Sequence, residues 1–386
     1  MAKSLSSLWF NSLNRIAKSQ QKKLVRSLTV ATQKATKAAV KEAFAPAKTV
    51  PKSAAKPAAK PVAKRAVKSP AKPAVKSTLP TALPGSWTHS FFLAPSGQRM
   101  TYWLYLPLRD MAKAVKPLPL VVMLHGCTQT APDFAQGSRM NALAQRKGFA
   151  VLYPQQLVAI DSHRCWQWYQ RATQNGGGEA GLVAGMVTQV VSLLGLDASR
   201  VYLAGISAGA ALAQIIALRY PFRIAAVGLH SGPVFGTADS RMTAFGAMQH
   251  GGGTQVAQAV QATVDGGGFP LMPAIILHGE ADKVVRIVNQ RQVAQQFCKV
   301  NGIAEVVPVS TNTPARPKGR SPRHAFQTQD YWVGRKPIVS VCRIAGLAHA
   351  WSGGDGVLRF NDNVGPDASA LMWAFFAKHR RLRTVQ

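Results

Sequence analysis

Acidic residues are scarce in this 386-residue chain, which has 15 Asp and Glu against 47 Lys and Arg and a formal net charge of +32. Residues 1–80 hold 18 of the basic residues and one acidic residue, Glu42, so 17 of the 32 excess charges fall in the first fifth of the chain. A segment of this kind suggests a polyanion or an anionic surface as its partner.

Long apolar runs are also lacking. No stretch is long and apolar enough to span a bilayer. The short apolar patch at residues 5–10 is broken by Ser6 and Ser7 and is soon followed by basic residues, with no clear small-residue cleavage site, so the sequence predicts no secretory signal. The compartment therefore stays open, and a cytoplasmic or granule-associated location is one alternative.

Cysteine is rare, with four residues at positions 127, 165, 298 and 342. Four cysteines are too few for a disulfide scaffold, and their spacing is not that of metal ligands. We expect neither a metal nor a cofactor. The cysteines could form two disulfides or remain four thiols, and the spacing alone does not decide between them.

The basic N-terminal arm has two parts. Residues 1–45 have helical periodicity with Leu8, Trp9 and Leu13 on one face, which predicts a basic amphipathic helix. Such a helix could lie on a membrane or other hydrophobic surface, dock a partner or pack on the folded part of its own chain. In residues 46–84 a lysine recurs every fourth position from Lys48 to Lys76 among alanines and prolines, which predicts a disordered, extended linker. Its composition is similar to linker-histone tails and to tails of polyester-granule proteins.

Residues 85–386 are expected to form the folded domain, with 47% hydrophobic content in the chain to build a core. Residues 86–93 and 100–106 alternate apolar and polar positions and predict an antiparallel hairpin. Alternating strands and helices after it predict an α/β fold with a doubly wound, mainly parallel sheet. We expect one helix over residues 132–147, a mobile lid at 235–269 and a surface excursion at 310–336.

The most informative motif is the G-x-S-x-G sequence of residues 205–209. A buried strand at residues 200–204 precedes it, and a helix at 210–220 follows it. Strand, motif and helix together predict a nucleophile elbow, with glycines where a side chain would collide and with Ser207 projecting from a strained corner. The alternative is a tight turn in which Ser207 has no chemical role.

A serine nucleophile needs a base and a group that orients the base. In α/β hydrolases these follow in the order Ser, Asp or Glu, His, on loops after later strands. Asp282 follows the strand at residues 274–277, and we favour it over Glu280. His349 follows the strand at 338–344, and we favour it as the base because His324 lies in a basic, proline-rich excursion and His379 in a terminal helix.

The oxyanion of the tetrahedral intermediate needs two donors. We predict the backbone N–H groups of Ala208 and Cys127, although Cys127 could instead be a catalytic thiol. Trp166, Trp168 and Trp351 could line the acyl or alcohol site or could simply pack in the core and its loops.

Five motifs occur in order: LHGCTQ at 124–129, CWQWY at 165–169, GISAG at 205–209, HGEAD at 278–282 and HAWSGG at 349–354. Over residues 87–378 the chain thereby resembles the poly(3-hydroxybutyrate) depolymerase family of esterases, which includes feruloyl and acetylxylan esterases. The resemblance implies an α/β-hydrolase fold, the site roles given above and an extracellular location. It also suggests the disulfides Cys127–Cys165 and Cys298–Cys342. Ser352 stands where the family often has proline, and Ala348 where glycine is usual.

The predicted function is a serine esterase that acts through an acyl-enzyme on a polyhydroxyalkanoate polyester or oligoester. One alternative is a feruloyl or acetylxylan esterase. Another is a tethering protein with an incidental hydrolase domain. The expected partner of the basic arm is a polyester granule or a membrane surface, with nucleic acid as the less favoured choice.

Overall fold

The computed structural model describes residues 83–109, 116–253, 256–265, 268–303, 306–316, 318–319 and 321–381. All of them belong to one compact unit, Pro80–Gln386. The predicted amphipathic segment at residues 1–45 and the linker at 46–84, apart from its last two residues, lie outside the described residues. The domain boundaries drawn from the sequence therefore stay a prediction.

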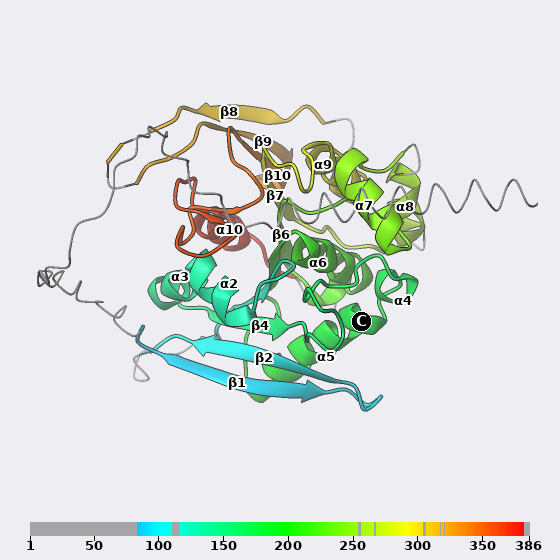
Figure 1. Cartoon of the computed structure of the whole chain (residues 1–386), viewed down its shortest axis with the longest axis vertical. Coiled ribbons are helices and arrows are strands. Elements are labelled where there is room, and N and C mark those ends of the chain that lie inside the picture. Colours follow the sequence, from blue (N-terminus) through cyan, green and yellow to red (C-terminus); the bar gives the residue numbers. More distant parts are fainter. Residues whose placement is uncertain are drawn as a thin grey trace, which may run out of the picture. The chain divides into compact units, whose positions relative to one another are not determined.

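A ten-stranded sheet forms the centre of this unit, in the order β1-β2-β4-β3-β5-β6-β7-β10-β9-β8 (Figure 1). Strands β4, β3, β5, β6, β7 and β10 run parallel, and antiparallel strands flank them on both sides. The predicted mainly parallel sheet with an antiparallel hairpin at one edge is confirmed. The strands are β1 (Ser86–Leu93), β2 (Arg99–Leu106), β3 (Leu120–Leu124), β4 (Ala150–Gln155), β5 (Val201–Ile206), β6 (Ala226–His230), β7 (Ala274–Gly279), β8 (Val309–Thr313), β9 (Phe326–Val333) and β10 (Lys336–Ile344); β11 (Trp351–Ser352) and β12 (Asn361–Asp362) pair separately.

Helices cover both faces of the sheet. Helices α5, α6, α7, α8 and α9 contribute to one apolar core, and α2, α3 and α10 to a second core. None of the helices in the described part is both long and apolar enough to cross a bilayer. The helices are α2 (Ala131–Ser138), α3 (Met140–Lys147), α4 (Arg171–Gln174), α5 (Gly178–Leu193), α6 (Ala208–Arg219), α7 (Arg241–His250), α8 (Val256–Val264), α9 (Val288–Val300) and α10 (Ala368–Phe376), with a 3₁₀ turn at Pro221–Arg223.

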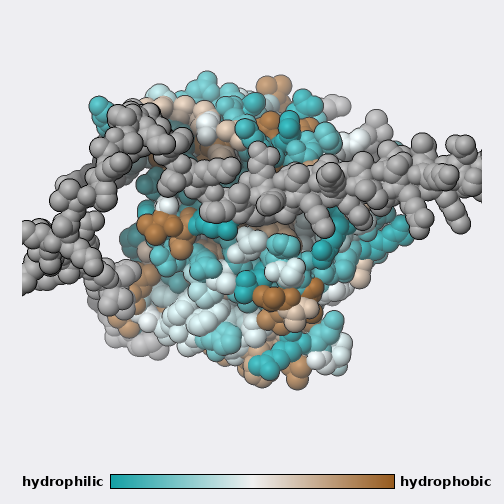
Figure 2. All heavy atoms as spheres, in the orientation of Figure 1, coloured by the Kyte–Doolittle hydropathy of each residue, from teal (hydrophilic) through white to brown (hydrophobic). Residues whose placement is uncertain are grey.

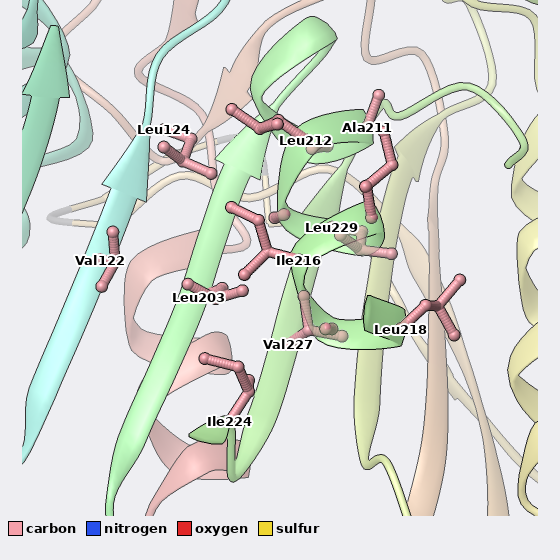
Figure 3. Packing of buried hydrophobic residues seen from close by; sticks show 14 of the residues in the cluster. Val122, Leu124, Leu203, Ala211, Leu212, Ile216, Leu218, Ile224, Val227 and Leu229 are labelled. Atoms are coloured by element: carbon pink, nitrogen blue, oxygen red, sulfur yellow. The ribbon is translucent and has the colours of Figure 1, made fainter. Parts of the chain in front are cut away.

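Strand β3 shows why the central strands are apolar throughout. All five of its residues are buried. Val122 and Leu124 face the core that Leu212 and Ile216 of α6 complete (Figure 3), whereas Val121 and Met123 belong to the core on the other face. Burial on both sides is the environment that selects a continuous apolar run over an alternating one. On the visible outer face, hydrophobic residues form separate patches among hydrophilic ones (Figure 2).

Two segments differ from the sequence-based expectation. The single helix expected at residues 132–147 is two helices, because Arg139 adopts a left-handed backbone with φ 56° that ends α2 and precedes α3. The excursion expected at 310–336 instead contains strands β8 and β9, which extend the sheet beyond β10. The segment expected to be a lid contains α7 and α8, and its mobility stays a prediction.

Candidate active site

Ser207 occupies the sharp turn between β5 and α6, as the motif predicts. Its backbone has φ 57° and ψ −124°, and the residue is 8% exposed. A Cβ at Gly209 would lie 2.1 Å from the Leu124 carbonyl oxygen, and one at Gly205 would lie 2.5 Å from backbone atoms of Gly209. Both glycines are therefore sterically required, and the turn holds the serine at the carboxyl edge of the sheet.

Asp282 and His349 lie together at the same edge of the sheet. Asp282 Oδ2 is 2.7 Å from His349 Nδ1, and Asp282 Oδ1 accepts hydrogen bonds from the Val284 and Val285 N–H groups, each at 2.9 Å. Burial by itself raises the pKa of Asp282, but attraction to His349, the hydrogen bond between them and the nearby His278 outweigh it and lower the pKa below its usual value. The carboxylate is therefore ionised and fixes the orientation of the His349 ring.

The rival residues for the two roles have other partners. Glu280 is half-exposed and forms an ion pair with Arg343 at 2.6 Å. His324 lies 3.2 Å from Asp362. The pKa of the buried His379 is lowered to about 4, mainly by burial. Within the described residues, the histidines within ion-pair distance of Asp282 are His349 and His278.

The structure does not join all three predicted catalytic side chains by hydrogen bonds. Ser207 Oγ makes none within the described part of the chain, and His349 Nε2 makes none there either. Ser207, Asp282 and His349 do follow β5, β7 and β10, whose carboxyl ends meet at one edge of the sheet. Catalytic hydrogen bonds are often long in ligand-free enzymes and tighten when substrate is bound.

Two further histidines at the site were missed by the sequence reasoning. His278 is fully buried, donates from Nε2 to the Val285 carbonyl at 2.7 Å and lies 3.6 Å from Asp282 Oδ2. His230 ends β6, and its pKa is lowered to about 3, first by burial and then by repulsion from His278 and His349. The place of each histidine at the carboxyl end of a strand was the signal that could have identified both.

The three predicted tryptophans are buried. Trp351 is 0% exposed, stacks on His230 at 5.3 Å and donates to Ser369 Oγ at 3.2 Å. Trp166 is equally buried and donates to the His125 carbonyl at 2.9 Å, and Trp168 is 5% exposed. These contacts agree with the packing alternative, and a substrate-binding role stays a prediction.

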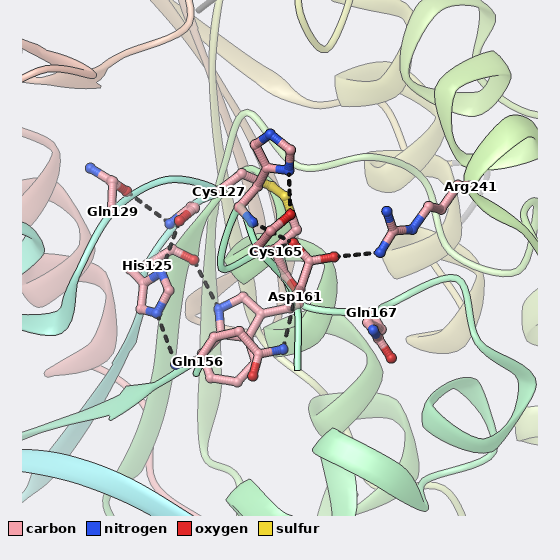
Figure 4. Close-up of a disulfide and its surroundings, with 12 residues drawn as sticks. His125, Cys127, Gln129, Gln156, Asp161, Cys165, Gln167 and Arg241 are labelled. Carbon is pink, nitrogen blue, oxygen red and sulfur yellow. Dashed lines mark hydrogen bonds and ion pairs between the residues drawn. A yellow bond between two sulfur atoms is a disulfide. The ribbon is translucent and has the colours of Figure 1, made fainter. Parts of the chain in front are cut away.

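The predicted oxyanion loop is tied down by a disulfide and several hydrogen bonds (Figure 4). Cys127 is bonded to Cys165, with their Cα atoms 4.3 Å apart, which confirms this pair and leaves Cys127 no free thiol. In the same loop, His125 Nε2 accepts a hydrogen bond from Gln156 N at 3.1 Å, and Gly126 N donates one to Gln129 Oε1 at 2.8 Å. Burial lowers the pKa of His125 to about 4, so its ring is neutral.

The predicted Cys298–Cys342 disulfide is wrong. Both residues are buried free thiols, and burial raises their pKa values to about 11 and about 12. Cys298 belongs to the core on one face of the sheet and Cys342 to the core on the other. The sheet separates the two sulfurs, so a bond between them cannot form without rearranging β10.

The segment that carries Cys165 has anchors of its own. Glu179, at the start of α5, accepts a hydrogen bond from Gln167 N at 2.6 Å and another from the side chain of Gln156. Burial raises the pKa of Glu179 to about 7. Asp161 pairs with Arg241 of α7 at 2.7 Å (Figure 4). No local sequence pattern pointed to these polar anchors.

No group of three or more His, Cys, Asp or Glu residues in the described ranges is arranged to hold a metal ion. Three features of the site are a serine at a strained turn, an imidazole oriented by a carboxylate and a neighbouring loop tied down by a disulfide.

In sequence and in fold, this chain is similar to known depolymerases and esterases. Poly(3-hydroxyalkanoate) depolymerase C of Paucimonas lemoignei is 32% identical over 60% of this chain and 54% of its own length. Probable acetylxylan esterase A of Neosartorya fischeri is 30% identical over 61% and 62%, so the chain spans only between half and two thirds of these relatives. Acetyl xylan esterase from Aspergillus awamori shares the fold, with a TM-score of 0.53 and 23% identity over 68% of this chain and 94% of its own. The family model for the esterase PHB depolymerases matches residues 100–319, and the chain belongs to that family.

Proposed function

We propose that this protein is a serine carboxylic ester hydrolase. The observation that carries the proposal is the 2.7 Å contact between His349 and an ionised Asp282, at the same sheet edge as the Ser207 turn. Because Asp282 accepts the Nδ1 proton, the lone pair of His349 lies on Nε2. That nitrogen is then available to take a proton from a serine hydroxyl.

The proposed reaction has two halves. Ser207 Oγ attacks the ester carbonyl while His349 Nε2 takes its proton, and the N–H groups of Ala208 and Cys127 stabilise the oxyanion. Collapse of the intermediate breaks the bond to the alcohol oxygen, which receives the proton from His349, and leaves the acyl group on Ser207. Water then attacks the acyl-enzyme with His349 again as base, and the acid is released.

We infer a hydroxyalkanoate polyester or oligoester as the substrate, because the family and a relative's name refer to depolymerases. Short acyl esters on a polysaccharide are the second candidate, supported by the acetylxylan esterase names of other relatives. We also propose residues 85–386 as the catalytic domain and residues 1–84 as a basic tether. The charge of this tether and the apolar face predicted for residues 1–45 suit a polyester granule or membrane better than nucleic acid.

The test is hydrolysis of p-nitrophenyl acetate by the full chain and by Ser207→Ala. We expect the variant to lose several orders of magnitude in kcat, because the nucleophile is gone while the fold remains. Ser310→Ala, a substitution on exposed strand β8, is the matched control and should retain full activity. A Ser207→Ala variant that kept a tenth of the rate would refute the proposal. Hydroxybutyrate oligomers, methyl ferulate and acetylated xylan then rank the substrate classes.

A further inference from the structure

A groove of about 840 Å³ lies between helix α9 and strands β9 and β10, and Ser207 is not among the residues that line it. One end of it is at Ile287, which directly precedes α9 and closely follows the Asp282 loop. Arg343 lines the same end, and it lies in register with His278 on the neighbouring strand. In Figure 1, α9, β9 and β10 are labelled next to one another. The groove therefore starts at the catalytic edge of the sheet and runs away from it along α9.

The helical wall of the groove carries Arg291, Gln295 and Lys299. Their spacing of four residues places them in one row on α9, and the two cations are about 12 Å apart along the helix axis. Neither cation forms an ion pair with any residue that the structure describes. Both charges are therefore available to a ligand.

The opposite wall is formed by alternate residues of β9, namely Gln327, Gln329 and Tyr331. These side chains are half-buried, and in the described part of the chain none of their polar atoms has a hydrogen-bond partner. Between the walls, the floor is apolar, with Ala294, Cys298 and Val341. A groove with an apolar floor and a few unpaired polar groups on its walls is typical of a binding site.

The chemistry of the walls distinguishes between polymers. Primary amides offer both donors and acceptors and so match hydroxyl groups, whereas a polyester offers acceptors alone. Two unpaired cations at a spacing of about 12 Å match carboxylates that occur at intervals, whereas a nucleic acid carries a charge on every unit. We propose that this groove binds a polysaccharide chain that bears spaced uronic-acid carboxylates, with the apolar floor against the sugar rings. This proposal makes the second substrate candidate more specific. Polysaccharide binding itself does not depend on the proposed esterase activity, and only the use of that binding in catalysis rests on the proposed function.

The test measures the binding of glucuronoxylan to the full chain in 0.3 M NaCl by affinity electrophoresis. Arg291→Gln/Lys299→Gln removes the two cations, and Gln327→Leu/Gln329→Leu removes the amides without changing net charge. The control, Arg146→Gln/Lys147→Gln, removes two exposed cations from α3, which packs against the other core. We expect each groove variant to bind about tenfold more weakly and the control to bind like the wild type. With carboxyl-reduced xylan, only the amide variant should bind more weakly than the wild type.

Turnover of p-nitrophenyl acetate separates this proposal from the proposed function. All three variants should keep the wild-type rate, which also shows that they fold. If the wild type does not hydrolyse the ester, the esterase proposal fails, whatever the groove binds. The groove proposal fails if the control weakens glucuronoxylan binding as much as Arg291→Gln/Lys299→Gln, since net charge then explains the binding. It also fails if the groove variants lose binding to poly-dT or polyester particles but not to glucuronoxylan.

Discussion

The Cys127–Cys165 disulfide is the strongest covalent constraint on the proposed oxyanion loop, and its removal gives a prediction with two separate magnitudes. The bond joins residues 38 positions apart. The chain-entropy relation for a loop of this length gives about 4 kcal/mol of stabilisation. We therefore expect Cys127→Ser/Cys165→Ser to lower the free energy of unfolding by about 4 kcal/mol, measured by urea denaturation followed by circular dichroism.

Removal of the disulfide should lower kcat much less than removal of the oxyanion donor itself would. Removing one oxyanion donor typically lowers kcat by about 10²–10³. In the double variant the Cys127 position keeps its N–H, and the loop keeps three bonds that do not involve sulfur: Gly126 to Gln129, Gln156 to His125, and Trp166 to the His125 carbonyl. We expect kcat with p-nitrophenyl acetate to fall about tenfold or less, at a temperature where the variant is folded.

Cys298→Ala/Cys342→Ala is the control, because it removes two sulfurs that form no disulfide. It should leave kcat unchanged and lower stability only by the lost packing. Alkylation of the unreduced, denatured protein followed by mass spectrometry should label Cys298 and Cys342 alone. The reasoning is refuted if the Cys127 and Cys165 variant unfolds at the wild-type urea concentration while kcat drops a hundredfold, or if four alkylated thiols are found.

Two further predictions concern buried carboxylates. Asp282→Asn should lower kcat for p-nitrophenyl acetate by about 10³–10⁴ with little change in KM, because the amide cannot stabilise a protonated His349; a variant that kept a tenth of the activity would contradict this role. In the folded state the pKa of Glu179 is raised from 4.5 to about 7. Below pH 4.5 the carboxyl is protonated in the folded and unfolded states, so its burial does not lower the free energy of unfolding. As the pH rises from 4.5 through 7, the free energy of unfolding falls by up to about 3 kcal/mol. Urea denaturation at pH 4.5 and pH 8 should show this decline in the wild type and not in Glu179→Gln, and equal declines in both proteins would overturn the assignment.

The features that could be predicted from the sequence have local steric or periodic causes. Gly205 and Gly209 must flank Ser207 because a Cβ at either position meets backbone within 2.5 Å. The apolar run of β3 follows from burial on both faces of the sheet. Asp282 could be preferred to Glu280 because chain order and distance from the strand end limit the choice. The hydrogen bond from His349 to Asp282 agrees with that choice.

Other features depend on contacts between distant segments, which a local pattern does not record. Glu179 lies at the start of a helix, where an acidic residue is ordinary, and only the fold reveals its bonds to Gln156 and Gln167. The error over Cys298 and Cys342 has a related cause. The resemblance paired two cysteines, but the alternation of β10 directs Cys342 to the face opposite α9. One position along the strand decides that outcome.

The buried histidines explain why chain order alone could not settle the identity of the base. His125 directly follows β3, whereas His230 and His278 lie within the carboxyl ends of β6 and β7, and burial lowers the pKa of all three. Each already uses a ring nitrogen: His125 accepts from Gln156 N, His230 from Ser352 N at 3.4 Å, and His278 donates to the Val285 carbonyl. Such rings stay neutral and hold loops in place.

His349 differs from them in the two properties that a base requires. Its Nδ1 is directed at a carboxylate that can balance a positive charge, and its side chain is 10% exposed where that of His278 is fully buried. His278 lies 3.6 Å from the same carboxylate, but it is fully buried, and burial lowers its pKa despite the attraction to Asp282. Under the proposed function, proton transfer therefore falls to His349. His230 stacks on Trp351 and accepts a hydrogen bond from Ser352 N, and both of these residues form β11, which begins two residues after His349.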